Sequence, residues 1–475
     1  MKKKYHIAIT GTFDVENYGD LMFPVVFEKA MKKRGLNFDL FLFSPSRTAK
    51  KALDNRTTVY SFQEFEELHK KHHFDALIVG GGAIIHFNSI RVKLPNGDKY
   101  EEYRNIDSWY TIACLAAKNN VKIIFNVPQA PFEFSKSVTP LARSVFLTAD
   151  YLSVRDEFSK KNILRTFQKN KTKDVLVYPD SVCSIACYYN KKELTTKAKK
   201  LVGFDGKYVV IHFSRVMPEE VESVLVKAIE RLRRDGYRIV FLPLGYTHGD
   251  DVAMRALKRK YRLDCITFKN KLSIDDMTAI LAGCDIYIGT SFHGSIVSIA
   301  FGGRALSFNY YEPTLKNVDN YRQFGISDYL VKNYSELLGK LDGLLKCPAS
   351  FKPSIEYNLA RVEEHFDKMH SIIVDGGGCM IGGYSTMQNE LLDAIARLPG
   401  YDEERLRDVA TINSLKKDND GLMMENERIN KEIEYYLNEL DEYKKNYDLL
   451  INSKTWKMTE PIRKMKDKIG SKWRK

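Results

Sequence analysis

The first candidate for chemistry is a histidine set among small residues. Segment 289–295 reads Gly-Thr-Ser-Phe-His-Gly-Ser, with His293 near its centre. The apolar run 284–288 before it predicts a buried strand, and the run 296–301 after it predicts a helix. Ligands bind at the carboxyl ends of strands in open α/β sheets, and helix N-termini there attract anions. An imidazole at such a turn is a candidate proton donor. The simpler alternative is a histidine that only caps the helix.

Two arginines also follow predicted strands. Arg155 comes after the run 151–154, and Arg215 comes after the run 208–213. A guanidinium group at a strand end facing a cleft binds carboxylate or phosphate with two parallel hydrogen bonds. We therefore predict both arginines as anion-binding residues. The alternative for Arg155 is a salt bridge with Asp156 or Glu157.

Two glycine-containing turns in the N-terminal half are candidate ligand contacts. The turn 11–20 lies between a predicted strand and a predicted helix, where a Rossmann fold has its phosphate loop. It lacks the G-x-G-x-x-G spacing, which argues against a nicotinamide enzyme. Asn17 either binds ligand there or supplies the geometry of the turn. Gly81 and Gly82 follow another predicted strand and allow a ligand or a neighbouring backbone to approach closely.

Composition limits the class of protein. The chain has 475 residues, enough for two or three domains, and its net charge of +13 favours anionic partners. Its seven cysteines are scattered and form no CxxC pair, so we predict reduced thiols and no metal. His86 and His212 are weaker candidates, because such histidines more often belong to the core. With no secretory signal and no apolar stretch long enough to span a bilayer, we expect a cytoplasmic protein, with peripheral contact at the inner face of the plasma membrane.

The order of predicted elements indicates two α/β domains. Short apolar runs predict strands at 5–10, 38–43, 76–79, 122–127, 151–154 and 175–178. The pattern restarts near residue 207, with strands at 208–213, 237–242, 265–268, 284–288 and 305–309. Strands that alternate with helices form parallel sheets covered on both faces. We predict Rossmann-like domains over 1–200 and 201–345, in a GT-B-like arrangement with a cleft between them.

A C-terminal helical and coiled-coil extension follows a linker and helical segment over 346–411. Over 412–451, apolar and polar residues repeat in heptads. This spacing predicts a coiled coil and a homo-oligomer, with asparagines at a positions to fix the register. The alternative is a single amphipathic helix packed on the globular part. The a and d positions are Ile412, Leu415, Asn419, Leu422, Asn426, Ile429, Ile433, Tyr436, Leu440, Tyr443, Tyr447 and Leu450.

The last segment, 452–475, is strongly basic. It carries nine lysines and arginines against two acidic residues, and apolar residues recur in it at helical spacing. A basic amphipathic helix with tryptophans suits an anionic membrane surface. Nucleic acid is a competing partner, but no nucleic-acid module accompanies the tail, so we predict no nucleic-acid binding. A plain solvated tail is the remaining alternative.

Several motifs together resemble the polysaccharide pyruvyl transferase family over roughly residues 5 to 335. Their order and spacing carry the resemblance, since each motif alone is weak. They are Asn17-Tyr18-Gly19-Asp20, Gly80-Gly81-Gly82, Ser153-Val154-Arg155-Asp156 with Ser159, Pro179-Asp180, Thr290-Ser291-Phe292-His293-Gly294, Tyr310-Tyr311 with Lys316, and Phe324-Gly325-Ile326.

The resemblance implies a GT-B-like fold and transfer of a pyruvyl group from phosphoenolpyruvate to a sugar, giving a cyclic ketal on a capsular or other cell-surface polysaccharide. It links Arg155, His293 and Lys316 to donor binding or catalysis. Ser291, which we also predict to contact substrate, stands where many members of the family carry arginine. We expect His293 as the acid, Arg155, Arg215 and Lys316 as the cations for the donor, and no cofactor besides this donor substrate.

The tail is similar to segments that follow coiled coils in bacterial surface-polysaccharide glycosyltransferases. That likeness implies a lipid-linked glycan acceptor on the cytoplasmic leaflet. Two other functions are compatible with the chain. One is a GT-B-type glycosyltransferase that uses a nucleotide sugar, although the second domain lacks the usual acidic pair near a helix start. The other is a non-catalytic scaffold of polysaccharide assembly, against which the set Arg155, His293 and Lys316 argues.

Overall fold

A computed structural model describes most of the first four hundred residues of the chain. The described residues are 3–45, 58–93, 100–214, 217–309, 315–346, 352–375, 385 and 387–389. The segments predicted as a coiled coil and as a basic tail, 412–451 and 452–475, lie outside these ranges. Both remain predictions.

The first sheet has five parallel strands in the order β3-β2-β1-β4-β7. This Rossmann-like order places the carboxyl ends of β1 and β4 side by side, where the chain turns toward a ligand. A bridge between Ile124 and Tyr151 leads on to the parallel pair β8 and β9. The strands are β1 (Tyr5–Thr10), β2 (Phe38–Ser44), β3 (Val59–Ser61), β4 (Ala76–Val79), β7 (Lys122–Phe125), β8 (Ser153–Val154) and β9 (Leu176–Val177).

The second sheet repeats this pattern. Its five parallel strands have the order β11-β10-β12-β13-β14, and His212 at the end of β10 lies opposite Gly289 at the end of β12. The central strands are buried on both faces, as parallel sheets require. The strands are β10 (Tyr208–His212), β11 (Arg238–Phe241), β12 (Ile286–Gly289), β13 (Arg304–Phe308) and β14 (Leu330–Val331).

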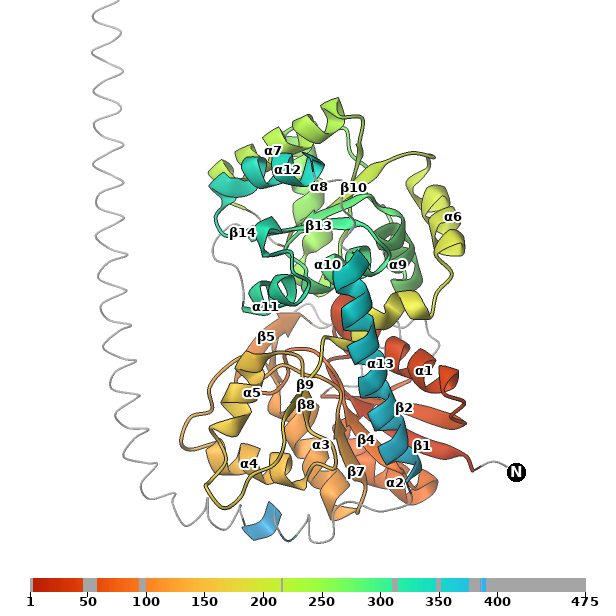
Figure 1. The fold of residues 1–475 in the computed structure, drawn as a ribbon, viewed down its shortest axis with the longest axis vertical. Helices are drawn as coiled ribbons and strands as arrows, with labels where there is room; N and C mark the ends of the chain where they lie inside the picture. The colour runs from red at the N-terminus through yellow and green to blue at the C-terminus, as the bar shows by residue number, and fades with distance from the viewer. Residues whose placement is uncertain are drawn as a thin grey trace, which may run out of the picture. The chain divides into compact units, whose positions relative to one another are not determined.

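Helices cover both sheets, and each sheet with its helices forms one lobe (Figure 1). In the first lobe these are α1 (Tyr18–Lys33), α2 (Phe65–His72), α3 (Ile106–Lys118), α4 (Thr139–Thr148) and α5 (Glu157–Leu164). In the second they are α6 (Lys191–Val202), α7 (Glu219–Arg234), α8 (Asp250–Lys260), α9 (Ile274–Gly283), α10 (Phe292–Ala300), α11 (Leu315–Gln323) and α12 (Leu337–Lys346). Among the described residues, none of the helices is long and apolar enough to cross a membrane.

Three differences from the sequence-based expectations have local causes. The predicted strand at 265–268 is reduced to one bridge between Ile266 and Val240, because only Ile266 hydrogen-bonds along the edge of β11. The short edge strands β3 and β14 were not predicted, since two or three residues carry no alternation. An antiparallel hairpin, β5 (Ser89–Lys93) with β6 (Tyr100–Arg104), was also missed.

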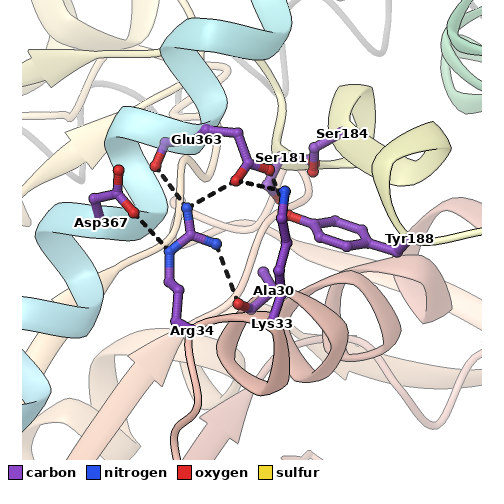
Figure 2. A network of polar contacts seen from close by, with 8 residues as sticks. All are labelled: Ala30, Lys33, Arg34, Ser181, Ser184, Tyr188, Glu363 and Asp367. Atoms are coloured by element: carbon purple, nitrogen blue, oxygen red, sulfur yellow. Dashed lines mark hydrogen bonds and ion pairs between the residues drawn. The ribbon is translucent and has the colours of Figure 1, made fainter.

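One long helix, α13 (Lys352–Val374), returns from the second lobe and packs along the first (Figure 1). Arg34, at the end of α1, holds it there through Nη2 at 3.0 Å from Glu363 Oε2 and Nε at 2.8 Å from Asp367 Oδ1 (Figure 2). The hydroxyl of Tyr188 donates to the same Glu363 at 2.8 Å. Ion pairs therefore join α13 to α1, and a hydrogen bond joins it to Tyr188, the residue that follows η3 (Ser181–Cys187).

The inner face of α13 buries a histidine. His365 Nδ1 lies 2.9 Å from the Tyr151 hydroxyl, and its Nε2 lies 3.0 Å from Asn126 Oδ1. Burial, with a smaller contribution from Arg34 and Lys368, lowers the pKa of His365 to about 3. This imidazole is therefore neutral and belongs to the packing of α13.

Replacing Arg34 by alanine tests whether the ion pairs hold α13. Its side chain is 10 % exposed, so the variant leaves Glu363 without its buried partner. We expect a loss in the free energy of unfolding of about 2–3 kcal/mol, below the range for fully buried pairs. Lys33→Ala is the matched control, because Lys33 also contacts Glu363 but is 50 % exposed, and should cost less than about 1 kcal/mol. Equal losses in urea denaturation would show that Arg34 has no special role.

Candidate active site

A cleft of about 400 Å³ lies where the strand ends of the two sheets face each other. The first lobe contributes the β1–α1 turn, the loop after β4 and the residue after β8, and the second contributes the ends of β10, β11 and β12. Its lining includes Asn17, Asp20, Gly82, His86, Arg155, His212, His248, Asp250, Thr290, Ser291, Phe292 and His293.

The turn that carries His293 has the predicted strand-to-helix form. β12 ends at Gly289, and α10 begins at Phe292. Ser291 is the N-cap, because its Oγ accepts a hydrogen bond from Gly294 N at 3.2 Å. The capping role therefore belongs to Ser291, and His293 is free of it within the first turn of α10. Ser291 also lines the cleft, so its predicted contact with substrate stays a prediction.

His293 is held on three sides. Its ring meets Phe23 edge to face at 5.3 Å between centroids, and its Nε2 lies 3.5 Å from Asp180 Oδ2. Gly19 packs against the other edge, where an added Cβ would come within 2.0 Å of Nδ1. Nε2 is buried and has no hydrogen-bond partner among the described residues. The imidazole is thus fixed in place, with a carboxylate as its nearest charged neighbour.

Asp180 joins His293 to Arg155. Its Oδ2 lies 3.2 Å from Arg155 Nη1, and its Oδ1 accepts from Val182 N at 3.0 Å. Burial raises the pKa of this carboxyl, but His293, Arg155 and the Val182 N–H together outweigh burial and hold it below its usual range. Asp180 is therefore an ionised carboxylate between the guanidinium group of Arg155 and the imidazole of His293.

Arg155 follows β8 as predicted and lines the cleft, but most of its charge is already engaged. Besides Asp180, it donates to Gln129 Oε1, and its Nε lies 3.9 Å from Asp156. The guanidinium also lies 4.6 Å from the ring centre of Phe292. A salt bridge was the alternative for this residue, and the structure shows one, with Asp180 as the closer partner.

The remaining predicted residues of the first lobe divide into two kinds. Asn17 lines the cleft and caps α1 through Oδ1, which accepts from Gly19 N at 3.1 Å. Gly82 lines the cleft with a φ of 91°, a backbone conformation that favours glycine. Gly81 does not line it: an added Cβ there would come within 1.9 Å of Phe23. Gly81 therefore acts on the site through packing.

Arg215 and the side chain of Lys316 lie outside the described residues. The next residue after Lys316, Asn317 on α11, donates to Ser307 Oγ at 3.2 Å and reaches the Thr290 carbonyl at 3.5 Å. The start of α11 therefore contacts the turn before His293. Both cations remain predicted site residues.

Sequence reasoning gave no role to three residues that the structure brings into the site. Asp180 was part of a motif and lies shortly after β9, whereas Arg155 directly follows β8. Thr290 was likewise part of a motif, whereas Asp250 had no signal of its own, because its partner His212 is distant in sequence. Among the described residues, no cluster of three or more histidines, cysteines and acids is placed to hold a metal ion.

The family described as polysaccharide pyruvyl transferase matches residues 17–312, more than half of the chain. The chain belongs to the polysaccharide pyruvyl transferase family. The predicted family is confirmed, and by family the chain is a transferase.

A curated relative, described as amylovoran biosynthesis protein AmsJ from Erwinia amylovora, is 26% identical over 169 residues. That match spans 32% of this chain and 38% of the relative.

The fold can be compared with that of solved structures. A UDP-GlcNAc 2-epimerase from Methanocaldococcus jannaschii has a TM-score of 0.50 at 13% identity, over 77% of this chain and 99% of that one. A glycosyltransferase from Rickettsia africae has a TM-score of 0.48 at 15% identity, over 79% of this chain and 100% of that one. At such identities the likeness concerns the fold alone. The predicted arrangement of two Rossmann-like sheets, as in GT-B-type proteins, is confirmed.

Gly19→Ala tests the close packing of His293 in this pyruvyl transferase-family site. The added methyl group would overlap the imidazole, so the ring or α1 must shift, which costs about 1–3 kcal/mol. Gly339→Ala is the control, because a Cβ at Gly339 in α12 meets nothing within 4 Å. The control should be neutral or gain up to about 1 kcal/mol. Urea denaturation measures both, and a Gly19→Ala variant as stable as its control would contradict the packing.

Proposed function

We propose that the chain transfers the pyruvyl group of phosphoenolpyruvate to a sugar of a cell-surface polysaccharide unit and forms a ketal. The single observation that supports this most is the buried array Arg155, Asp180 and His293 on the cleft of a pyruvyl transferase-family protein. The match to a protein named for amylovoran biosynthesis also supports a role in polysaccharide formation.

Binding of the anionic donor needs positive charge, and the array of Arg155, Asp180 and His293 offers little of it. Arg155 faces the carboxylates of Asp180 and Asp156, so its charge is largely balanced within the protein. Phosphoenolpyruvate brings both a carboxylate and a phosphate. The N-terminus of α10 supplies N–H groups and a positive dipole end beside Ser291. We assign the remaining positive charge needed to bind phosphoenolpyruvate to Arg215 and Lys316.

His293 is the proton donor in this proposal. Its proton goes to the methylene carbon of the donor, which leaves positive charge on the neighbouring carbon. A sugar hydroxyl then attacks that carbon, and a second hydroxyl displaces phosphate to close the ketal. Asp180, at 3.5 Å from Nε2, orients the imidazole and offsets its positive charge before transfer.

His293→Ala should lower turnover by about 10²–10⁴-fold, the contribution of one general acid, while the protein stays folded. The measurement is phosphate release from phosphoenolpyruvate with methyl hexopyranosides that have free 4- and 6-hydroxyl groups as acceptors. His73→Asn is the control, because His73 is exposed and its φ of 55° suits asparagine. Full activity of His293→Ala would remove the histidine from the mechanism.

We further propose that the acceptor is a lipid-linked glycan at the membrane. The basic segment 452–475 would bind anionic lipid there, and 412–451 would hold copies of the chain together. Deleting 452–475 should weaken binding to vesicles that contain phosphatidylglycerol, without lowering activity on a soluble acceptor. Vesicle sedimentation at low salt measures the binding. Binding equal to that of the full chain would rule out the tail as the membrane contact.

A further inference from the structure

A second histidine, His212, faces the same cleft from the end of β10 and has a partner on each ring nitrogen. Its Nε2 lies 2.9 Å from Asp250 Oδ2, and its Nδ1 lies 3.2 Å from Thr290 Oγ1. The imidazole is 4 % exposed, Asp250 is 1 % exposed, and Thr290 is half-buried. All three line the cleft. This hydroxyl, imidazole and carboxylate row has no role in the donor chemistry described above.

The surrounding hydrogen bonds determine which atom donates and which accepts between Asp250, His212 and Thr290. Asp250 Oδ2 also accepts from Gly245 N at 2.7 Å and Leu244 N at 3.2 Å, at the N-terminus of α8. With the His212 ring nitrogen and these two backbone N–H groups around it, Oδ2 acts as an acceptor. His212 must then donate from Nε2, which leaves Nδ1 as a proton acceptor for the Thr290 hydroxyl. The Thr290 hydroxyl can therefore pass its proton to His212 Nδ1 and accept another proton from a group in the cleft.

A purely structural pair would not need this arrangement. Asp250 alone already joins β10 to α8 through His212. The further contact to Thr290 depends on the close approach of β12 to β10, where an added Cβ on Gly289 would come within 2.7 Å of the His212 carbonyl oxygen. The result is a hydroxyl at the cleft surface with a base behind it, the arrangement that activates hydroxyl groups in enzymes.

We propose that His212 is the general base that accepts the proton of the attacking sugar hydroxyl, through Thr290, with Asp250 as its positioning residue. This inference rests on the proposed function and adds the group that deprotonates the acceptor. As the sugar oxygen bonds to the donor carbon, its proton passes to Thr290 Oγ1, and the Thr290 proton passes to His212 Nδ1. His293 protonates the methylene group in the same stage.

The second stage returns both histidines to their starting states. The second sugar hydroxyl bonds to the same carbon while the carbon–oxygen bond to phosphate breaks. The departing phosphate takes a proton from His212, and the hydroxyl proton goes to His293. Overall, one hydroxyl proton ends on the new methyl group and the other on phosphate. No oxidant, metal or further reactant is needed for this balance.

Among the residues that the structure describes, few other ionisable groups face His212. They are Asp250 on α8, Tyr287 on β12 and His248 on η4 (Tyr246–His248), with Asp20, His86, Arg155 and His293 elsewhere on the cleft. Burial raises the pKa of Tyr287 well above its usual value, so this phenol stays neutral. Asp250, at 2.9 Å from Nε2, is therefore the charged group in direct contact with His212.

His212→Gln tests the base. Glutamine can still donate to Asp250 but takes up no proton at the position of Nδ1. With phosphoenolpyruvate and methyl hexopyranosides, we expect kcat to fall by about 10²–10⁴-fold. The acidic limb of the pH profile of kcat/KM should disappear, and phosphoenolpyruvate should still raise Tm as in the wild type. A wild-type kcat and an unchanged pH profile in this variant would overturn the assignment.

Two substitutions at Thr290 give a second test that does not alter the buried pair. Thr290→Val removes the hydroxyl at nearly constant shape, and Thr290→Ser keeps it. Turnover should fall by at least about 10-fold in the valine variant, and the serine variant should recover most of it. Equal turnover in the two variants would overturn the relay, whether or not His212→Gln folds.

Failure of the inference and failure of the proposed function give different results. If phosphoenolpyruvate neither binds to the wild type nor releases phosphate, the proposed function is wrong and the inference is overturned with it. If the wild type is active and loses activity in His293→Ala but not in His212→Gln, only the assignment of the base is wrong.

Discussion

The ionised carboxylate of Asp180 is the constraint on which the site depends. It accepts from Arg155 at 3.2 Å and faces His293 Nε2 at 3.5 Å, and it is almost fully buried. A buried charge costs several kcal/mol unless it is paired, so Asp180 requires positive charge or donors beside it. Arg155 and Asp180 follow strands associated with the first sheet, whereas His293 begins a helix of the second. The pairing of charges therefore fixes where one lobe meets the other.

Packing imposes a second requirement around the same imidazole. Phe23 lies between Gly81 and His293, so the absence of a side chain at residue 81 sets the position of the phenyl ring that supports the histidine. Gly19 leaves room on the other edge. Two of the glycines near the cleft thus serve the position of His293. Glycines in a turn allow another group to come close to the backbone, and this group can be a ligand or a side chain. At Gly19 and Gly81 it is a side chain.

The sequence predicted those features that depend on neighbouring residues. Strands 5–10 and 76–79 have the expected bounds. It also predicted that His293 and Arg155 follow strand ends. It could not predict the partners of these residues, since Asp180 is far from His293 in the chain and Asp250 is far from His212. Such contacts depend on strand order and helix packing, which no local pattern contains.

Both histidines lie at or just after the ends of neighbouring strands of the second sheet, but their charged partners differ. His212 ends β10 and His293 follows β12, and these strands are hydrogen-bonded neighbours with His212 opposite Gly289. Their spacing is therefore set within a single sheet. The spacing of His293 from Asp180 and Arg155 is instead set by the meeting of two lobes, which α13 and Arg34 help to hold. Any change in that meeting alters the charge next to the proposed acid and leaves the proposed base unchanged. The proposed donor protonation thus depends on contacts between the two lobes, whereas the proposed acceptor deprotonation depends on contacts within the second lobe alone.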